Sequence, residues 1–363
     1  MGPSRVFAQA APVLDFIWYP TATPRDPASF CFVASVRECP VKLLDGTDGR
    51  LRASYRIVDH RERQVAPHSL AFNLTAQKLY CGFEDAIEVF DVSRPGEGTR
   101  VPTTPSKKSK DGLKGIVSAL AFSPSYSHDE SFYAAGSLSS SIQNIAMFSD
   151  TGTEPLMFIG GGPRLGVTQL QFNPLKPHIL YASYRGRESG SVYSWDIRSN
   201  VDAPLEIFQT PSAGTLDKTN QKIKFDVDLA GRFLSIGDQQ GDIFFFDLNN
   251  SDNSAEDSAD PLLSDVARTT YPTTHFKAHE DAVGSVAFHP LQSRLLSASG
   301  SRHYVDEDTD VDEDTDEHSD IESTTHSATE PIDTVSPQTR PHIIRRQGQP
   351  LTFDSTLKIW DVQ

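Results

Sequence analysis

The strongest constraint on the fold is a sequence motif, called the repeated phrase below, that occurs several times along the chain. Each copy begins with an apolar-alternating run that ends in Phe-x-Pro, continues with a run of small residues, and closes with a second alternating run that ends in an aromatic residue and Asp. The fullest copy runs from His279 to Pro290 and on to Ser299, and it resumes at Asp354 to end in Trp360-Asp361. Such a period indicates a repeat architecture.

Looser copies keep the same order over residues 68–91, 116–148, 167–196 and 223–247, and a degenerate copy covers residues 16–57. Each copy holds short stretches in which apolar and polar residues alternate with period two, separated by Gly, Pro, Asp or Ser. This pattern is typical of antiparallel strands joined by tight turns. No stretch keeps a helical period, so the sequence predicts an all-β protein.

A unit of four short strands cannot bury both of its faces alone, so the copies must pack face to face, and a ring protects the outermost edges. The sequence therefore predicts a WD-repeat β-propeller of four-stranded antiparallel blades, six of which are recognisable. Residues 5–14 are expected to form only the outer strand of a further blade. Either the sequence begins inside a propeller or the ring closes with six blades. A missing blade would leave an exposed strand edge.

The net charge of -16 is concentrated in one segment. Residues 306–333 hold thirteen Asp or Glu and no Lys or Arg, which leaves a net charge of -3 for all other residues. Such a block is too charged and too poor in apolar residues to fold. We therefore expect a propeller over residues 12–300 plus 351–363, a disordered acidic insertion over 301–350 in the last blade, and a short disordered acidic loop over 251–266.

The acidic insertion has two interpretations. It could be a phosphorylatable or partner-binding loop, because hydroxyl residues lie among its acids, as Ser319, Ser323, Thr324 and Thr325 do. It could also be a tolerated loop expansion, which we favour because long surface insertions cost little loop entropy.

Several classes of protein are disfavoured. The three cysteines are an odd number without a C-x-x-C pair, so neither a disulfide framework nor a metal site is expected, and a reducing compartment fits best. No apolar run reaches the length of a membrane span. We expect no cofactor, no membrane and no small-molecule substrate, and we find no sign of an enzyme.

Four residues of the last copy could suggest a catalytic constellation: His279, Ser297, Asp354 and Trp360. In WD repeats these residue types form a buried hydrogen-bond ladder that runs from the indole N–H through Ser and His to an Asp in a turn. The sequence therefore predicts a structural role for them and no catalytic residue.

Positive charge gathers in three places. Arg50, Arg52 and Arg56 lie on and around one outer strand, followed by Arg61 and Arg63. A second group of lysines occupies residues 107–114, and a third group, consisting of Arg185, Arg187 and Arg198, is expected to flank one blade's inner turn. Guanidinium groups pair with phosphate and stack on bases, as recognition of single-stranded RNA requires. Each cluster taken singly is also explained as an ordinary solvated surface, which we favour.

Several longer sequence motifs are more specific than the repeated pattern itself. It includes Asp45-Gly46, Gly49-Arg50-Leu51-Arg52-Ala53-Ser54-Tyr55-Arg56, residues 66–72, 79–83, 89–96, 115–124 and 133–137, Gly160-Gly161, Trp195-Asp196-Ile197-Arg198 and Asn220-Gln221-Lys222-Ile223 with residues 225–228. In this order these motifs resemble the telomerase Cajal body protein family. The resemblance covers residues 12–300.

The resemblance implies a function. That family binds the CAB-box loop of H/ACA small Cajal body RNAs and telomerase RNA, and its members act as non-enzymatic adaptors for RNP localisation and telomere maintenance. It implies telomerase and H/ACA RNP proteins as partners and a nuclear location in Cajal bodies, and it leaves a cytoplasmic pool open. The family's ring has a further N-terminal blade, which makes seven. By resemblance the RNA-binding residues would be Arg50, Arg52, Arg56, Arg185, Arg187 and Lys222.

A protein-only WD-repeat scaffold that binds peptides or histones is the alternative. The two functions differ in one geometric requirement. RNA binding needs the arginines of residues 50–63 and 185–198 to converge in space, whereas a scaffold permits them to scatter.

Overall fold

The computed structural model describes residues 5–106, 108–109, 111–124, 131–186, 188–211, 221–249, 267–303 and 351–362. The chain divides into two units. The first is Met1–Ser301 with Phe353–Gln363, and the second is Arg302–Thr352, in which His303 pairs with Leu351 in an antiparallel bridge. The segments expected to be disordered, 251–266 and most of 301–350, lie outside the described residues. The proposed domain boundaries therefore stay a prediction.

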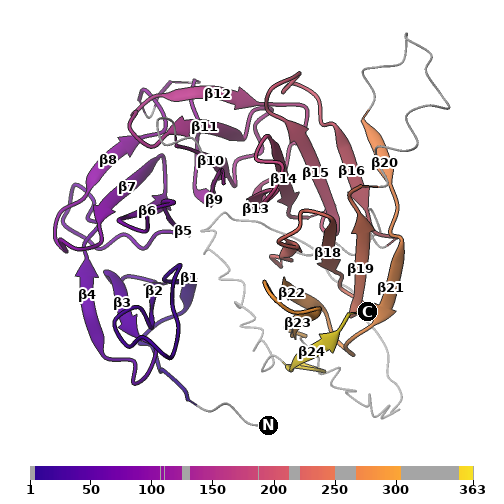
Figure 1. Ribbon diagram of the computed structural model, residues 1–363. Helices are drawn as coiled ribbons and strands as arrows, with labels where there is room; N and C mark the ends of the chain where they lie inside the picture. Colours follow the sequence, from indigo (N-terminus) through magenta and orange to yellow (C-terminus); the bar gives the residue numbers. More distant parts are fainter. Residues whose placement is uncertain are drawn as a thin grey trace, which may run out of the picture. The chain divides into compact units, whose positions relative to one another are not determined.

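The first unit consists of six sheets that follow one another around a common centre (Figure 1). The first three sheets contain β1 (Val13–Trp18), β2 (Cys31–Val36), β3 (Val41–Asp45) and β4 (Leu51–Tyr55); β5 (Ser69–Phe72), β6 (Lys78–Phe83), β7 (Ala86–Asp91) and β8 (Thr99–Pro102); and β9 (Val117–Phe122), β10 (Phe132–Ser137), β11 (Ile145–Ser149) and β12 (Pro155–Ile159). The other three contain β13 (Val167–Phe172), β14 (Ile179–Tyr184), β15 (Ser191–Asp196), β16 (Glu206–Gln209) and β20 (Arg268–Thr270); β17 (Phe225–Val227), β18 (Phe233–Gly237), β19 (Asp242–Asp247) and β21 (Thr274–Lys277); and β22 (Val283–Phe288), β23 (Arg294–Ser299) and β24 (Leu357–Asp361).

Within each sheet the first three strands named above, and the fourth where one is described, pair antiparallel in that order, with the first strand innermost. The predicted all-β fold, a six-bladed β-propeller, is confirmed. Among the described residues there is no helix, and hence none long and apolar enough to cross a membrane.

Three details differ from the prediction. β20 joins the fourth sheet as a fifth strand, parallel to β16. The sixth sheet has three strands in the described part of the chain. Residues 5–12 form no strand, and β1 begins at Val13 as the inner strand of the first sheet, so the expectation of an outer strand over residues 5–14 was wrong. These residues instead contact the first sheet, where Phe7 packs on Phe32 with ring centroids 6.0 Å apart.

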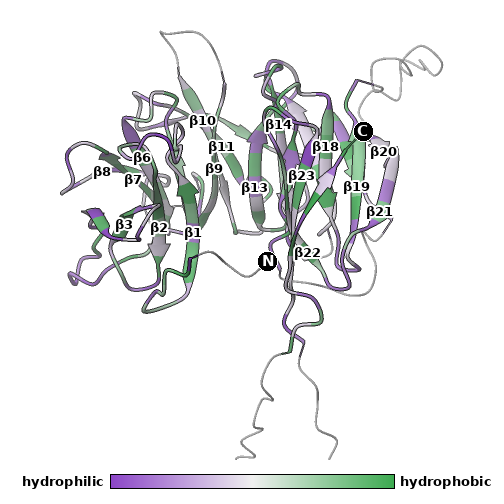
Figure 2. Cartoon of the chain, turned by 60° about the horizontal axis from the view of Figure 1, so that its bottom comes forward, coloured by the Kyte–Doolittle hydropathy of each residue, from purple (hydrophilic) through white to green (hydrophobic). Residues whose placement is uncertain are grey.

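The core lies between consecutive sheets. Figure 2 shows apolar residues along the strands, and five hydrophobic clusters each join one sheet to the next. Middle strands are covered on both faces, which explains why β15 (Ser191–Asp196) is buried at five of its six positions. Burial of apolar surface between sheets is the main stabilising contribution in such a fold.

Glycine at one position of the second strand lets neighbouring sheets approach closely. A Cβ added to Gly136 of β10 would lie 2.6 Å from Cγ1 of Val167, which belongs to the next inner strand. The same approach recurs in two other sheets, where Gly82 faces Val117 at 2.7 Å and Gly237 faces Val283 at 2.5 Å. The small residues of the repeated phrase are thus a packing requirement.

Side chains also tie each inner strand to the next. Ser118 Oγ donates to the Val167 carbonyl oxygen at 2.6 Å, and Ser69 Oγ donates to the Val117 carbonyl at 2.8 Å. Asp15, Gln169 and Asp226 make equivalent ties with backbone N–H groups of Leu70, Phe225 and Phe288.

The sixth and first sheets lack this connection. Among the described residues, none of the five clusters and none of these inner-strand ties joins β22–β24 to β1–β4. Apolar side chains are exposed on both sheets instead, namely Phe16 and Trp18 on β1, Leu296 on β23, and Leu357 and Ile359 on β24. The six sheets form an arc with two apolar ends.

Candidate functional site

The direction of the strands decides which residues share a face of the propeller. We call the side on which the inner strands begin the start face, and the opposite side the end face. Because neighbouring strands in a sheet are antiparallel, second and fourth strands finish on the start face. The turns between second and third strands and the connections between sheets therefore lie on the start face.

The Gly-Arg-Leu-Arg motif is divided between the two faces. Arg50 and Arg52 stand at the beginning of β4, which is on the end face, whereas Arg56 follows the last residue of β4 on the start face. A strand rises about 3.3 Å per residue, so roughly 20 Å separates Arg50 from Arg56 along the strand. The structure does not bring these three predicted RNA-binding residues together.

Arg52 is engaged within the protein. Its Nε and Nη2 donate to Asp45 Oδ2 at 3.1 and 2.7 Å, and Nη1 donates to the Ala28 carbonyl oxygen at 2.6 Å. Nη2 also donates to the carbonyl oxygens of Pro27 and Phe30. Hydrogen bonds from Arg52 and from the Thr47 backbone hold the pKa of Asp45 well below its usual range. The guanidinium thus fixes the turn between β1 and β2 against the turn after β3.

Arg50 is solvent-exposed on the end face. Its Nε lies 3.4 Å from Asp45 Oδ2 and 3.9 Å from Asp48 Oδ2, with 71% of the side chain accessible. Ion pairs of this kind contribute little to stability. Arg50 is therefore available to a partner, but next to two carboxylates.

Three of the predicted residues share the start face. Arg56 and Arg185 are exposed, and Arg185 follows the last residue of β14, where its backbone N–H donates to the Gly166 carbonyl at 3.0 Å. Lys222 precedes β17 and is exposed as well. Arg187 lies outside the described residues. Arg198 follows β15 on the end face, paired with Asp196 at 2.8 Å, so the expectation that it flanks the same turn as Arg185 was wrong.

The start face has a basic centre, where the channel between the inner strands opens. A cavity of about 150 Å³ lies there between the first halves of the inner strands, with Lys222, Lys224 and Asp15 in its lining. Lys224 Nζ lies 4.0 Å from Asp15 Oδ1. Burial raises the pKa of Asp15 although Lys224 opposes this shift. Although the Lys222 side chain is exposed overall, partial desolvation of its ammonium group lowers its pKa, and the charge of Lys224 lowers it further against the opposing charge of Asp15.

The pKa of His68 is affected by the positive charges of this region. Burial lowers the pKa of His68, and the charges of Lys222 and Arg37 lower it further. Arg37 follows β2 and His68 precedes β5, so both belong to start-face turns. Sequence reasoning missed Arg37, His68 and Lys224. Strand direction was the signal that would have found them, because each lies at a strand end that must face the same side.

The four residues of the expected ladder form a continuous chain of hydrogen bonds. Trp360 Nε1 donates to Ser297 Oγ at 2.8 Å, Ser297 Oγ lies 2.7 Å from His279 Nε2, and His279 Nδ1 lies 3.1 Å from Asp354 Oδ2. The imidazole is fully buried. Hydrogen bonds from Thr356 and His279 hold the pKa of Asp354 well below its usual range. The ladder joins β23 and β24 to the connection before β22 and to the turn before β24, which is a structural arrangement.

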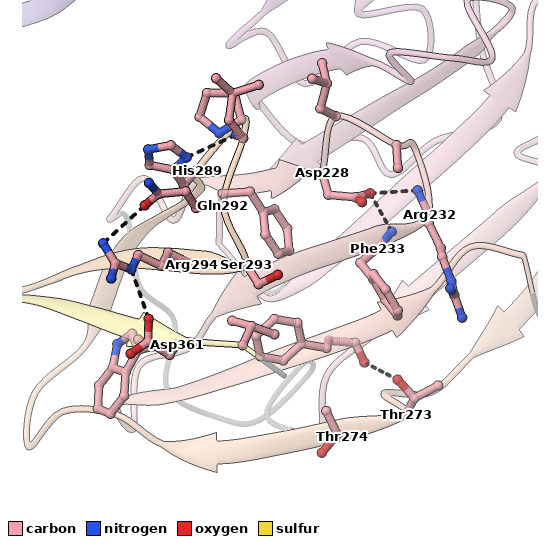
Figure 3. A pocket seen from close by; sticks show the side chains of 18 of the residues that line it. Asp228, Arg232, Phe233, Thr273, Thr274, His289, Gln292, Ser293, Arg294 and Asp361 are labelled. Carbon is pink, nitrogen blue, oxygen red and sulfur yellow. Dashed lines mark hydrogen bonds and ion pairs between the residues drawn. The ribbon is translucent and has the colours of Figure 1, made fainter.

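A larger pocket lies elsewhere, between the fifth and sixth sheets. It measures about 1120 Å³, and Phe233, Phe245, Phe276, Phe288 and Trp360 provide its aromatic lining. Polar groups at its rim are paired with each other, as Figure 3 shows for Arg294 with Asp361 and for Asp228 with the backbone of Arg232 and Phe233. Within the described residues, no group of His, Cys, Asp and Glu is arranged to hold a metal ion.

Comparison with known proteins agrees with this architecture. The WD domain, G-beta repeat family matches residues 270–303. Telomerase Cajal body protein 1 from Mus musculus and from Homo sapiens is 31% identical to the chain over 305 residues, which is 82% of this chain and 52% and 50% of those proteins. The guanine nucleotide-binding protein negative regulator 1 from Schizosaccharomyces pombe is 30% identical over 231 residues, 62% of this chain and 54% of that protein. The chain spans about half the length of these relatives, and the resemblance found in its motifs is confirmed.

Proposed function

Because this chain is a WD-repeat homologue of telomerase Cajal body protein 1, we propose that it is a non-enzymatic adaptor that binds RNA. The RNA would be the CAB-box loop of H/ACA small Cajal body RNAs and of telomerase RNA. Telomerase and H/ACA RNP proteins would be its protein partners. The adaptor would act in the nucleus, in Cajal bodies, in RNP localisation and telomere maintenance.

One arrangement supports the proposal: Lys222 and Lys224 stand together at the basic centre of the start face, and Arg56 of the first sheet and Arg185 of the fourth sheet lie on the same face. A net negative protein needs such a local concentration of cations to attract a polyanion. The charges of Lys222 and Arg37 contribute to the lowered pKa of His68, as expected for a group beside cations.

The chemistry of these groups fits a short single-stranded loop. Arginine binds phosphate with two donors at once and stacks on splayed bases, whereas lysine supplies a point charge for the backbone. Arg56 and Arg185 would hold the flanks of the loop, and Lys222 and Lys224 would hold phosphates at the channel mouth. Arg52 has no part in this, since its donors are engaged with Asp45, Pro27 and Ala28.

Ultraviolet crosslinking of the protein in its own cells, followed by sequencing of the attached RNA and mapping of the crosslinked peptides, tests the proposal. Enrichment of H/ACA-type RNAs, with crosslinks in a terminal loop and in peptides that contain Arg56, Arg185 or Lys222, is the expected result. Crosslinks confined to the end face would move the site to Arg50. Absence of RNA alongside a reproducible set of proteins would contradict the proposal.

That last outcome corresponds to the second candidate, a protein-only WD-repeat scaffold that binds peptides or histones. The similarity to a relative named as a negative regulator of a guanine nucleotide-binding protein favours it, because that name refers to a protein partner. Such a scaffold would not need the cations of the start face, so replacing them would leave its partners bound.

A further inference from the structure

The cavity at the basic centre of the start face combines apolar walls with charged groups. It measures about 150 Å³, and residues of β1, β5, β9 and β13 line it together with the residues before β17. Four leucines belong to this lining, namely Leu14, Leu70, Leu120 and Leu170. An engineered cavity of about this volume holds one benzene molecule, so the space suits a single six-membered ring.

The neutral polar side chains of the lining make hydrogen bonds within the protein, namely Ser69, Ser118, Thr168 and Gln169. Gln169, for example, exchanges two hydrogen bonds with the Phe225 backbone, at 2.8 and 3.0 Å. Recognition of a ligand in this cavity therefore depends on its three charged residues, Asp15, Lys222 and Lys224.

Asp15 keeps unused acceptor capacity within the described part of the chain. Its Oδ1 accepts the Phe16 N–H at 3.0 Å and its Oδ2 accepts the Leu70 N–H at 2.9 Å, whereas a carboxylate has about four lone-pair sites. The Asp15 side chain is 18% exposed, and Lys224 Nζ lies 4.0 Å from Oδ1, beyond the length of a hydrogen bond. A partly desolvated carboxylate of this kind gains from a ligand that brings an N–H donor.

Lys222 and Lys224 place the opposite charge at the mouth of the cavity. Ile223 between them is 4% exposed, so the two lysines share the side opposite to it, and both line the cavity. Lys224 is 49% exposed, and Lys222 is exposed as well. Two ammonium groups and one carboxylate leave a net charge of +1, which attracts an anionic ligand.

Simpler ligands fit this combination poorly. Inorganic phosphate and an acidic side chain are anions that Asp15 would repel, and neither has a ring for the apolar walls. A lysine or arginine side chain of a partner protein would meet the two ammonium groups. A ligand that carries a phosphate, a flat ring and an N–H on that ring matches every group of the cavity. A nucleotide has this chemistry.

We infer that the channel cavity binds one pyrimidine nucleotide. The base enters between the apolar residues, and the imide N–H of uracil or the amino group of cytosine donates to Asp15. The phosphate pairs with Lys222 and Lys224. A purine has two fused rings and exceeds the space for one. The nucleotide is either free or one residue of a single-stranded RNA loop, and in the second case the inference rests on the proposed function.

Calorimetric titration of the full chain at low salt tests the inference. The ligands are uridine monophosphate (UMP), cytidine monophosphate, adenosine monophosphate and ribose 5-phosphate, which has the phosphate without a base. Both pyrimidine nucleotides should bind about tenfold more tightly than ribose 5-phosphate, as expected for a hydrogen bond to a charged group. Adenosine monophosphate should bind like ribose 5-phosphate, through its phosphate alone.

Three variants assign the roles of the side chains. Asp15→Asn keeps an acceptor for the Leu70 N–H but turns an amide N–H toward the base, so it should remove the advantage of UMP over ribose 5-phosphate. Lys222→Met should weaken both ligands equally. Arg94→Met, at an exposed position after β7 on the end face, is the control and should change neither affinity.

A change in the ligand makes the same test without altering the protein. Should Asp15→Asn fail to fold, 3-methyluridine monophosphate, which lacks the imide N–H, should bind the parent chain like ribose 5-phosphate. Pentauridylate separates the two sources of the nucleotide. Tighter binding of pentauridylate than of UMP indicates an RNA loop, whereas equal affinities indicate a free nucleotide.

Equal affinities for UMP, adenosine monophosphate and ribose 5-phosphate would overturn the inference, and so would an unchanged UMP affinity in Asp15→Asn. Crosslinks of H/ACA-type RNA to the start face together with such a result would leave the proposed function standing. Selective UMP binding without any crosslinked RNA would contradict the proposed function alone. The two failures are therefore distinguishable.

Discussion

Trp360 donates its indole N–H to the hydroxyl of Ser297 at 2.8 Å, and the same hydroxyl reaches the imidazole of His279 at 2.7 Å. One small side chain therefore connects the third strand of the sixth sheet to the segment that precedes its first strand. Ser297 is fully buried, so water cannot take its place as the hydrogen-bond partner of Trp360 and His279.

Ser297→Ala should lower the free energy of unfolding by about 1–3 kcal/mol, because it leaves the buried His279 nitrogen and the indole N–H without a partner. Urea denaturation measures the change. Ser355→Ala, at an exposed position of the same blade, is the control and should stay within about 0.5 kcal/mol of the parent. Equal effects of the two substitutions would contradict a role for the ladder in stability.

Gly136→Ala should lower the free energy of unfolding by about 1–3 kcal/mol, because the added Cβ meets Val167 at 2.6 Å. Combination with Val167→Ala should recover part of the loss, since the two sites share one contact. Gly152→Ala, where the nearest atom lies at 3.4 Å, is the matched control. Thermal unfolding of the four variants checks this, and strict additivity would contradict it.

Arg52→Ala should lower the urea midpoint, whereas Arg50→Ala should leave it unchanged, because only the guanidinium of Arg52 is bonded to three carbonyl oxygens and a carboxylate. The pKa of Asp45 is lowered in the folded state, so its contribution is complete above pH about 4, the unfolded value, and is lost as the pH falls toward the folded value. The difference between parent and Arg52→Ala should therefore shrink below pH 4. A constant difference down to pH 3 would contradict the ion pair as its cause.

Arg56→Ala combined with Arg185→Ala should weaken RNA binding and reduce the slope of log K against log salt by about 0.7 for each phosphate that the arginines no longer neutralise. Both side chains are exposed, so the unfolding midpoint should not change. Arg50→Ala, on the opposite face, is the control for nonspecific charge. If Arg50→Ala weakened binding more than the double variant, the start face would not be the RNA site.

RNA affinity should rise several-fold as the pH falls through 6.5, the usual value for histidine. The pKa of His68 is lowered in the free protein by burial, Lys222 and Arg37, and a bound phosphate would raise it, so binding favours the protonated ring. His68→Gln should flatten this dependence. Binding isotherms between pH 5.5 and 8 make the comparison, and an identical pH profile in the variant would exclude His68.

The strands were predictable because their chemistry is local. Period-two runs such as Val167–Phe172 and Ser191–Asp196 appear as β13 and β15, and the aromatic-Asp endings mark third strands. The placement of charge was not predictable from the motif alone. Arg50 and Arg56 are close in sequence but on opposite faces, because an extended strand separates its ends, and Arg52 is occupied by carbonyl groups of a turn more than twenty residues earlier.

Pairings between distant segments were also missed. β20 (Arg268–Thr270) joins β16 (Glu206–Gln209) in parallel, which no local pattern encodes, since it depends on a contact across some sixty residues of sequence. The aromatic pocket escaped notice for the same reason. Phe233, Phe276 and Trp360 look like ordinary strand residues, and only the packing of the fifth sheet against the sixth brings them together around one pocket.

The arc of sheets also determines how the protein comes apart. A closed ring must break two interfaces to release any blade, whereas an arc can lose its first or sixth blade by breaking one. Unfolding should thus begin at the first and sixth blades and move inward. Protection against hydrogen exchange should be lowest in β1–β4 and β22–β24 and highest in the third and fourth blades. The first and sixth blades should therefore have the lowest free energy of unfolding, and a ligand that binds both of them would raise it.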